Sequence, residues 1–424
     1  MVWQPNRKAA PSPSRPMSTA VSRTSTDVLE LHSAQDAVDA VRRARREGRR
    51  VIVLSPRDGA PADAGDALVV STAALTGVEI DADMWRARVE AGALWRDVAL
   101  PASELGLAPL AAQAGDSPVV PDTLHGGVSW LARLHGLACN SLTAVEIVTP
   151  DGELVRADFT QEPELFEALR GGGEQLGLVV AVEMLLHPVA QLYAGSLMWP
   201  IERAPEILRR WRDWARTAPV ELTSVVRLLR TPDSECVPAP FRGRAFVAVE
   251  AAYAGCAAAA APFIDHLRHL QPEIDTFTTM PPAGLLALHG DPECLDGRRV
   301  GGHTLLGALP DDAIDAVVEI AGADAETPLC SFEIRHLGGA LATEARYAGA
   351  VPSVDAEFAA VAVGLAAPGE DASPLTAATA AALEHMARWR SGDPLTSCAR
   401  ARVRDLKRRV DPARMFAGSP RYAR

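Results

Sequence analysis

Cysteine is sparse in this sequence, with six residues among 424, and the six lie far apart. No two of them form a Cys-x-x-Cys pair, and none stands at zinc-ligand spacing from a histidine, so we predict no metal site. Isolated cysteines of this kind are typical of buried thiols in a reducing compartment. The sequence therefore indicates a protein of the cytoplasm rather than a disulfide-stabilised secreted protein.

Long apolar runs are also missing, and no segment is long enough to span a bilayer. Residues 1–26 lack the apolar core of a secretory signal, and we interpret them as a disordered tail in which Met17 is an alternative start. A concentrated basic surface is absent as well, because the formal net charge is −12. These absences exclude membrane insertion and argue against a nucleic-acid partner.

The composition that is present is ordinary for a globular protein, with 48% hydrophobic and 23% charged residues over a length that suits two or three compact units. In the first half, apolar runs predict strands at 51–54, 67–70, 86–91 and 178–186, and apolar stripes predict helices at 33–48, 94–105 and 162–169. A hairpin is predicted at 144–155, where Pro150-Asp151-Gly152 joins two apolar runs.

The second half differs because its predicted strands alternate with a period of two, at 222–229, 245–253, 331–337 and 358–365. Helices with apolar stripes lie between them, at 207–214 and 256–270. This pattern indicates an antiparallel sheet with one face covered by helices and the other face turned to something else. A last helix, 400–410, ends at Asp411-Pro412. The fold class is therefore α+β.

A glycine run at 171–173 suggests a dinucleotide-binding loop, but the Rossmann fingerprint needs a strand before the run and a helix after it. Here the predicted helix comes before the glycines and the strand after them. A helix C-cap followed by close backbone packing is the interpretation favoured for this segment alone.

Several blocks occur together in one order and spacing: Gly106–Leu110, Trp130–Asn140, Val145–Gly152, Leu165–Gly173, Leu186–Pro188 and Leu406–Phe416. This series resembles the FAD-linked oxidoreductases of the p-cresol methylhydroxylase (PCMH) and vanillyl-alcohol oxidase superfamily, in the bacterial berberine-bridge-enzyme-like branch. The resemblance covers nearly the whole chain after the tail.

The resemblance implies a PCMH-type FAD-binding domain of two subdomains at 27–190 and a substrate domain at 191–390, whose antiparallel sheet covers the flavin ring. A segment at 391–424 is implied to return to the FAD-binding domain. FAD is the implied cofactor, with its pyrophosphate bound by backbone N–H groups of two loops. Many members attach the flavin covalently to a histidine of the first loop, and some also to a cysteine of the second.

The first loop follows the predicted strand 51–54, and its implied cofactor-binding residues are Ser55, Arg57, Asp58, Gly59 and Ala60. Asp58 stands at the position of the attachment histidine, and an aspartate cannot form that bond. Pro56 removes one N–H donor, whereas Arg57 could pair with a phosphate. We therefore expect FAD to be held noncovalently, if it is held at all.

The second loop spans 117–130, and Pro118, Pro121 and His125 stand at its family glycines. It offers no cysteine for attachment, and Glu167 and Glu174 replace a tryptophan and a glycine of a later block. The cofactor-facing blocks are thus altered while the packing blocks are not, which predicts a degenerate flavin site. The cofactor-binding residues implied for this loop and the blocks after it are Ser117, Val120, Asp122, Thr123, Gly126, Gly127, Leu137 and Val148.

The candidate catalytic residues are His125, Glu333, Arg335 and His336. His125 could act as an acid or base in the flavin cleft, or be a satisfied histidine that fills space. Period two places Glu333 and Arg335 on one face of their strand and His336 on the other, and one set would lie over the active site. A structural Glu–Arg surface pair is an equally open alternative. His303 is predicted to be an ordinary loop residue.

Two hypotheses about function stay open, and both have a small molecule as the partner. In the first, the protein is an FAD-dependent oxidoreductase that transfers a hydride from a small, apolar or polyketide-like secondary metabolite to the flavin. In the second, it is a flavin-free descendant, either a non-redox cyclase or isomerase or a binding protein that uses the vacated cleft. The redox prediction depends on the resemblance, because fold does not determine function.

Overall fold

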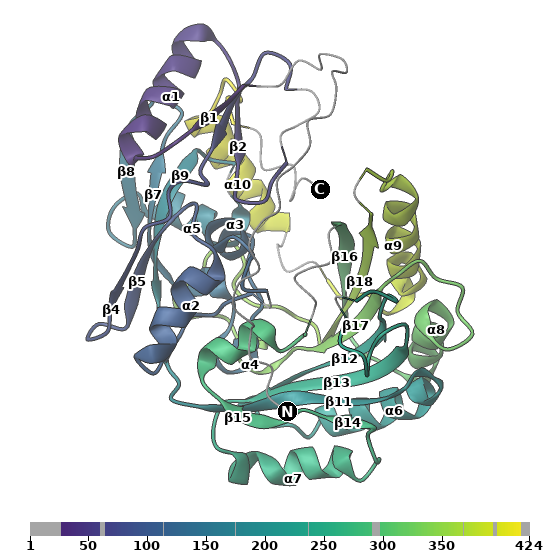
Figure 1. Cartoon of the computed structure of the whole chain (residues 1–424). Helices are drawn as coiled ribbons and strands as arrows, with labels where there is room; N and C mark the ends of the chain where they lie inside the picture. The colour runs from purple at the N-terminus through teal and green to yellow at the C-terminus, as the bar shows by residue number, and fades with distance from the viewer. Residues whose placement is uncertain are drawn as a thin grey trace, which may run out of the picture.

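The structure is a computed structural model that describes residues 27–59, 64–112, 114–173, 175–235, 237–290, 297–367, 369–392 and 397–416. The chain forms two lobes, with the first half of the sequence in one and most of the second half in the other (Figure 1). Within these ranges no helix combines the length and the apolar character needed to cross a membrane.

The amino-terminal lobe begins with a small parallel sheet in the order β1-β3-β2. Its strands are β1 (Val28–Glu30), β2 (Val51–Leu54) and β3 (Leu68–Ser71), and helix α1 (Ala34–Glu47) connects the first two. The side chain of Ser33 accepts a hydrogen bond from the N–H of Asp36 and so caps α1. Parallel pairing places the carboxyl end of β2, and with it the start of the first loop, at the edge of this sheet.

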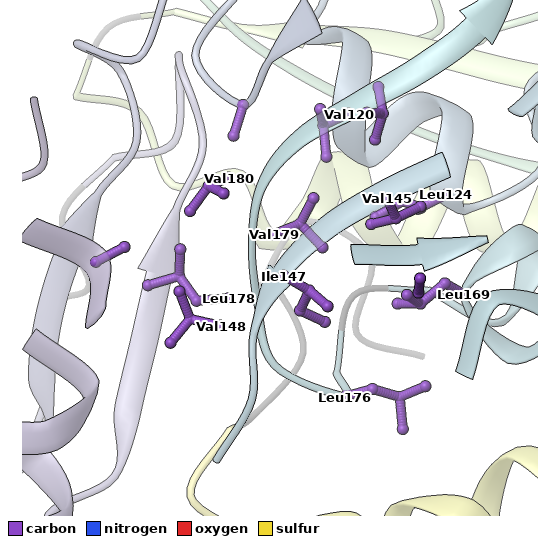
Figure 2. Close-up of a cluster of buried hydrophobic side chains, with 14 of the residues drawn as sticks. Val120, Leu124, Val145, Ile147, Val148, Leu169, Leu176, Leu178, Val179 and Val180 are labelled. Carbon is purple, nitrogen blue, oxygen red and sulfur yellow. The ribbon is translucent and has the colours of Figure 1, made fainter. Parts of the chain in front are cut away.

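A five-stranded antiparallel sheet completes this lobe, in the order β4-β5-β9-β7-β8. Buried side chains of its strands and helices form one hydrophobic cluster, of which Figure 2 shows part. The strands are β4 (Val78–Asp81), β5 (Arg86–Glu90), β7 (Leu142–Val148), β8 (Leu154–Asp158) and β9 (Leu178–Leu185). The helices are α2 (Trp95–Glu104), α3 (Val119–Leu124), α4 (Ala132–His135) and α5 (Pro163–Gly172), and the short strands β6 (Leu107–Ala108) and β10 (His187–Pro188) pair with each other.

The second lobe is an eight-stranded antiparallel sheet in the order β14-β11-β13-β12-β17-β18-β16, with β15 paired to β11. Its strands are β11 (Leu192–Pro200), β12 (Leu222–Arg230), β13 (Ala245–Tyr253), β14 (Ile274–Asp275), β15 (Thr278–Met280), β16 (Arg298–Leu306), β17 (Ser331–His336) and β18 (Phe358–Ala366). The helices α6 (Ala204–Ala215), α7 (Ala257–Arg268), α8 (Asp311–Ala321) and α9 (Ser373–His385) lie along its outer side (Figure 1).

The two faces of this large sheet differ in character. The outer face carries a continuous apolar core with those helices, in which Val226 of β12, Val249 of β13 and Phe332 of β17 are buried. The inner face packs on the amino-terminal lobe, because Val225 of β12 shares a cluster with Trp130. The predicted arrangement, with helices on one face only, is confirmed.

The last helix, α10 (Ser397–Val410), returns to the amino-terminal lobe, where it lies beside α5 (Figure 1). The N–H of Val51 donates to the carbonyl of Met415 at 2.8 Å, and Val51 forms a β-bridge with Phe416. The end of the described chain therefore lies against the first residue of β2.

The predicted elements have the observed types, but several details differ. His303 lies in strand β16 opposite Val361, so its predicted placement in a loop was wrong. Cys256 is exposed, whereas Cys139 is buried as predicted. The tail 1–26, Ala60 and Glu174 lie outside the described residues.

Candidate functional site

The first loop turns back on itself through the carboxylate of Asp58. The N–H of Ser55 donates to Oδ2 of Asp58 at 2.9 Å, and the N–H of Asp58 donates to the carbonyl of Ser55 at 3.0 Å. An anion-binding loop offers such N–H groups to a phosphate. In this chain the carboxylate of Asp58 takes one of them, which is a physical consequence of the aspartate at the attachment position.

Arg57, the neighbour of Asp58, has a φ of 70°, in the left-handed region that favours glycine. Its guanidinium lies 2.7 Å from the carboxylate of Asp116, the residue directly before the second loop, and the two side chains are 53% and 36% exposed. The pair therefore links the two loops across the surface, and Arg57 is already engaged by a carboxylate. Gly59 follows with open space beside its Cα among the described residues.

The second loop contains a short helix, α3, which the glycine-rich family pattern does not predict. Pro118 is its N-cap and Pro121 lies in its first turn, where backbone N–H groups need no partner, so the prolines are compatible with the helix. Val120 and Thr123 are buried, and the hydroxyl of Thr123 donates to the carbonyl of Val119 at 2.7 Å. These two side chains are packing residues of the lobe.

Ser117 and Asp122 fasten this helix to α2. The N–H of Trp95 donates to the carbonyl of Ser117 at 3.0 Å, and its indole Nε1 donates to Oδ2 of Asp122 at 3.3 Å. Leu137 and Val148, also predicted near the cofactor, have buried side chains, so only their backbone can reach a ligand.

Two glycines, Gly126 and Gly127, stand at the end of the second loop, and the backbone of the first borders open space. Gly126 is buried with a φ of 115°, and a Cβ there would meet no atom within 4 Å. At Gly127, φ is 72° and a Cβ would lie 2.7 Å from that of Ala138, so only glycine fits. The backbone of Gly126 therefore borders open room inside the lobe.

His125 lies between α3 and the glycine run. Its side chain is exposed, and its Nδ1 donates to the carbonyl of Pro121 at 2.8 Å. A Cβ at Gly173 would be 3.0 Å from its Nε2, so the ring covers that glycine. The structure thus brings His125 to the glycine loops and not to Glu333 or Arg335.

A charged cluster lies on the inner face of the large sheet. Arg227 of β12 lies opposite Glu333 of β17, and its Nη1 donates to Glu250 of β13 at 2.9 Å. His289 contacts both Arg227, at 3.0 Å, and Glu250. Nε and Nη2 of Arg335 donate to Glu333 at 3.1 and 2.9 Å. We call Arg227, Glu250, His289, Glu333 and Arg335 the inner-face cluster.

Glu333 is ionised in this cluster. Burial alone raises the pKa of its carboxyl, but Arg335, Arg227 and His289 outweigh this effect and lower the pKa to about 2. With 4% of its surface exposed, Glu333 is not half of a surface pair, the structural alternative considered from the sequence. A carboxylate this acidic is a poor proton acceptor near neutral pH.

His336 lies apart from the cluster, on the other face of β17. Its ring lies 5.9 Å from that of Phe358 between centroids, in a tilted arrangement, and contacts the guanidinium of Arg133 from α4. Burial, and then the charge of Arg133, lowers the pKa of His336 to about 3, so the imidazole is neutral. Arg133 also donates to the carbonyl of Leu337 at 2.8 Å, so this contact joins the two lobes.

Sequence reasoning missed Arg227, Glu250 and His289. The available signal was a charged residue inside each of two otherwise apolar strands, at Arg227 and Glu250. Strand pairing brings them together from distant segments, and His289 lies outside any regular element, so no local pattern marks it. Within the ranges described above, no group of three or more metal-ligating side chains is close enough to hold an ion.

The geometry of the two loops indicates whether these residues can hold FAD. Gly59 and Gly126 border open space, so backbone approach to a cofactor is possible at both loops. Neither a histidine at the first attachment position nor a cysteine at the second is present. The site therefore fits a cofactor held by noncovalent contacts.

Residues 27–158 match the FAD binding domain family. Among characterised relatives, (R)-6-hydroxynicotine oxidase of Paenarthrobacter nicotinovorans is 30% identical over 172 residues, which are 39% of this chain and 37% of that protein. An FAD-linked oxidoreductase of Dictyostelium discoideum is 24% identical over 309 residues, 72% of this chain and 65% of that protein. An FAD-dependent monooxygenase of Cochliobolus heterostrophus is 32% identical over 154 residues, 36% of this chain and 30% of its own length. The chain thus matches between about a third and two thirds of these relatives' lengths.

Solved structures agree over most of the chain. 6-Hydroxy-D-nicotine oxidase from Arthrobacter nicotinovorans superposes with a TM-score of 0.76 at 20% identity, covering 92% of this chain and 90% of that one. A variant of berberine bridge enzyme has a TM-score of 0.77 at 15% identity and covers 92% and 88%. The predicted PCMH-type fold is confirmed. By the domain match over residues 27–158 and by its fold, the chain is similar to members of the p-cresol methylhydroxylase and vanillyl-alcohol oxidase superfamily, and the matched domain supports FAD as its cofactor.

Proposed function

We propose that this protein is an FAD-dependent oxidoreductase that holds FAD without a covalent bond and oxidises a small metabolite between its two lobes. The observation that carries the proposal is the inner-face cluster, which lies on the sheet face that packs on the FAD-binding domain. Replacing buried ion pairs by apolar side chains is often neutral or stabilising, so stability alone does not explain such a cluster. Strongly perturbed pKa values are typical of functional sites.

The cofactor would be held by backbone groups of the two loops, around Ser55–Gly59 and Gly126–Gly127. The chemistry that FAD supplies when bound is acceptance of a hydride from the substrate. Ala60 belongs to the same proposal by sequence alone. His125, which covers Gly173, would shape the wall of this site rather than touch the substrate.

The chain's own residues would bind the substrate and take its proton. His289 is the histidine of the cluster, a side-chain type used for general acid–base catalysis, and its contact with the buried Glu250 orients the ring. Glu333, with its pKa of about 2, would serve as a fixed negative charge that positions Arg227 and Arg335. His336 would act indirectly, by joining β17 to α4 through Arg133.

The visible spectrum of the purified protein, before and after acid precipitation, tests this proposal. We expect a yellow protein that releases its flavin into the supernatant, and a colourless fraction that regains the spectrum when FAD is added. Flavin that stays in the precipitate would contradict noncovalent binding. A folded protein that remains colourless in excess FAD would overturn the oxidoreductase proposal and leave a non-redox catalyst or binding protein.

A further inference from the structure

The inner-face cluster is a row of alternating charges that becomes more accessible toward one end. The exposed fraction of the side chain is 0% for Glu250, 2% for Arg227, 6% for Glu333 and 24% for Arg335. Each carboxylate lies between two positively charged or histidine side chains. The row therefore ends in a guanidinium that a ligand can reach.

The hydrogen bonds of Arg335 leave part of this guanidinium unused. Nε and one N–H of Nη2 both donate to the same oxygen of Glu333. A guanidinium has five N–H donors, and in the described part of the chain Nη1 of Arg335 has no acceptor. The edge formed by Nη1 and Nη2 is the one that binds a carboxylate in a two-pronged fashion. The two hydrogen bonds to Glu333 fix the direction in which this edge of the guanidinium points.

Arg335 also lies at the boundary between the lobes. Its neighbour across β12 is Val225, which is buried with Trp130 and Leu131, and its neighbour across β18 is Ala359, which is buried with Leu137. These three contacts come from the segment that follows Gly126–Gly127. The free edge of Arg335 is thus flanked by apolar groups of the FAD-binding domain.

A second unsatisfied donor lies at the same boundary. Among the described residues the indole Nε1 of Trp130 has no hydrogen-bond partner, although only 2% of the residue is exposed, and its ring lies 5.3 Å from that of His289. A buried donor without an acceptor is costly, by about 1–3 kcal/mol in general. Both unused groups are donors, so a ligand at this boundary must bring acceptors.

From these contacts we infer that the substrate is an organic acid, with an apolar body that lies against Trp130 and a carboxylate that pairs with Arg335. This inference rests on the proposed function and specifies its substrate class. Arg335 would be a specificity-determining residue, since a neutral analogue would leave its N–H edge unpaired. Discrimination against such analogues is strong where a site is built around a polar group.

Pairs of acids and their amides test the inference on the full-length protein as purified with its flavin. The probes are phenylacetate with phenylacetamide and hexanoate with hexanamide, and the readouts are the shift in melting temperature and the change in flavin absorbance. We expect the acids to bind at least about 10-fold more tightly than the amides, and Arg335→Gln to remove that difference by weakening acid binding about 10- to 100-fold.

Two further variants serve as controls. Arg335→Lys keeps a positive charge beside Glu333 and loses the two-pronged edge, so it should fold normally and retain only part of the preference. Arg216→Gln removes an exposed arginine paired with Glu357 and should leave the preference unchanged. Equal binding of acids and amides, or a preference that survives Arg335→Gln, would overturn the inference.

The same samples separate this inference from the proposed function. A yellow protein without a preference for acids would contradict the proposed substrate class and leave the oxidoreductase proposal standing. A protein that stays colourless in excess FAD but prefers acids in the melting assay would support the carboxylate site at Arg335 and contradict the oxidoreductase proposal.

Discussion

At the scale of single residues, Arg227 is the positive charge that balances two buried carboxylates. It lies between two buried carboxylates, 2.9 Å from Glu250 and 3.5 Å from Glu333. Removal of one partner from a buried ion pair leaves an uncompensated charge and typically costs 3–5 kcal/mol. We therefore expect Arg227→Met to lower the free energy of unfolding by about 3–5 kcal/mol, measured by urea denaturation at neutral pH.

The matched control for this prediction is Arg388→Met. Arg388 is 68% exposed and pairs with Asp312 on the helix-covered side, and an exposed pair contributes less than about 1 kcal/mol. If the two variants lost similar stability, the account of the inner-face cluster as a desolvated charge network would be wrong.

At the scale of elements, α4 and β10 are joined by two stacked imidazoles. The rings of His135 and His187 lie 3.9 Å apart between centroids, and the Nε2 atoms of both are buried with no hydrogen-bond partner in the part of the chain that the structure describes. Burial, and then the proximity of His135, lowers the pKa of His187 from 6.5 to about 3. The folded protein therefore holds His187 neutral in a range where the unfolded chain protonates it.

The sign of the pH effect follows from this difference. Between pH 6.5 and pH 3 the unfolded state binds the additional proton, so stability falls as the pH falls. One such group contributes a slope of up to about 1.4 kcal/mol per pH unit. We expect His187→Gln to reduce the slope of unfolding free energy between pH 6 and 4 by about this amount.

Denaturant titrations at several pH values would measure that slope. His266→Gln, at an exposed position of α7, is the control and should leave it unchanged. An unaltered slope in the His187 variant would show that the imidazole is protonated in the folded protein.

At the scale of the whole molecule, Asp411 helps to hold the end of the described chain against the amino-terminal lobe. Its buried carboxylate accepts hydrogen bonds from the N–H groups of Met415 and Phe416, at 2.8 and 3.0 Å, and from Lys407 at 2.5 Å. Phe416 in turn pairs with Val51, the first residue of β2. Loss of this carboxylate would release the chain end from the edge of the small parallel sheet.

We expect Asp411→Ala to lower the midpoint of thermal unfolding by about 5–10 °C, because two buried N–H groups lose their acceptor and Lys407 loses its carboxylate partner. Circular dichroism melting would measure the change. Asp405→Ala, on the exposed side of the same helix, should shift the midpoint by less than about 2 °C. A small shift for Asp411→Ala would mean that the apolar contacts of Phe416 alone hold this end in place.

Much of the fold follows from local sequence patterns. Helix α1 begins at the Ser33 cap, β12 and β13 follow their period of two, and the hairpin of β7 and β8 turns at Pro150–Gly152, as predicted. These features depend on neighbouring residues, whose periodicity and turn preferences act over a few positions. The ordered blocks that resemble the superfamily further predicted how these elements are arranged and that FAD is the cofactor.

The candidate site was only partly predictable, because its parts meet through long-range pairing. Sequence alone marked Glu333 and Arg335 as facing one side, but not that Arg227, Glu250 and His289 would surround them. The prolines of the second loop suggested a damaged anion site, whereas folding uses Pro121 in the first turn of α3. By itself the sequence determined the elements, through local preferences, and its ordered blocks indicated the fold. Only the tertiary structure decided which charges share the inner face, because strand order and register are set by packing across the whole sheet.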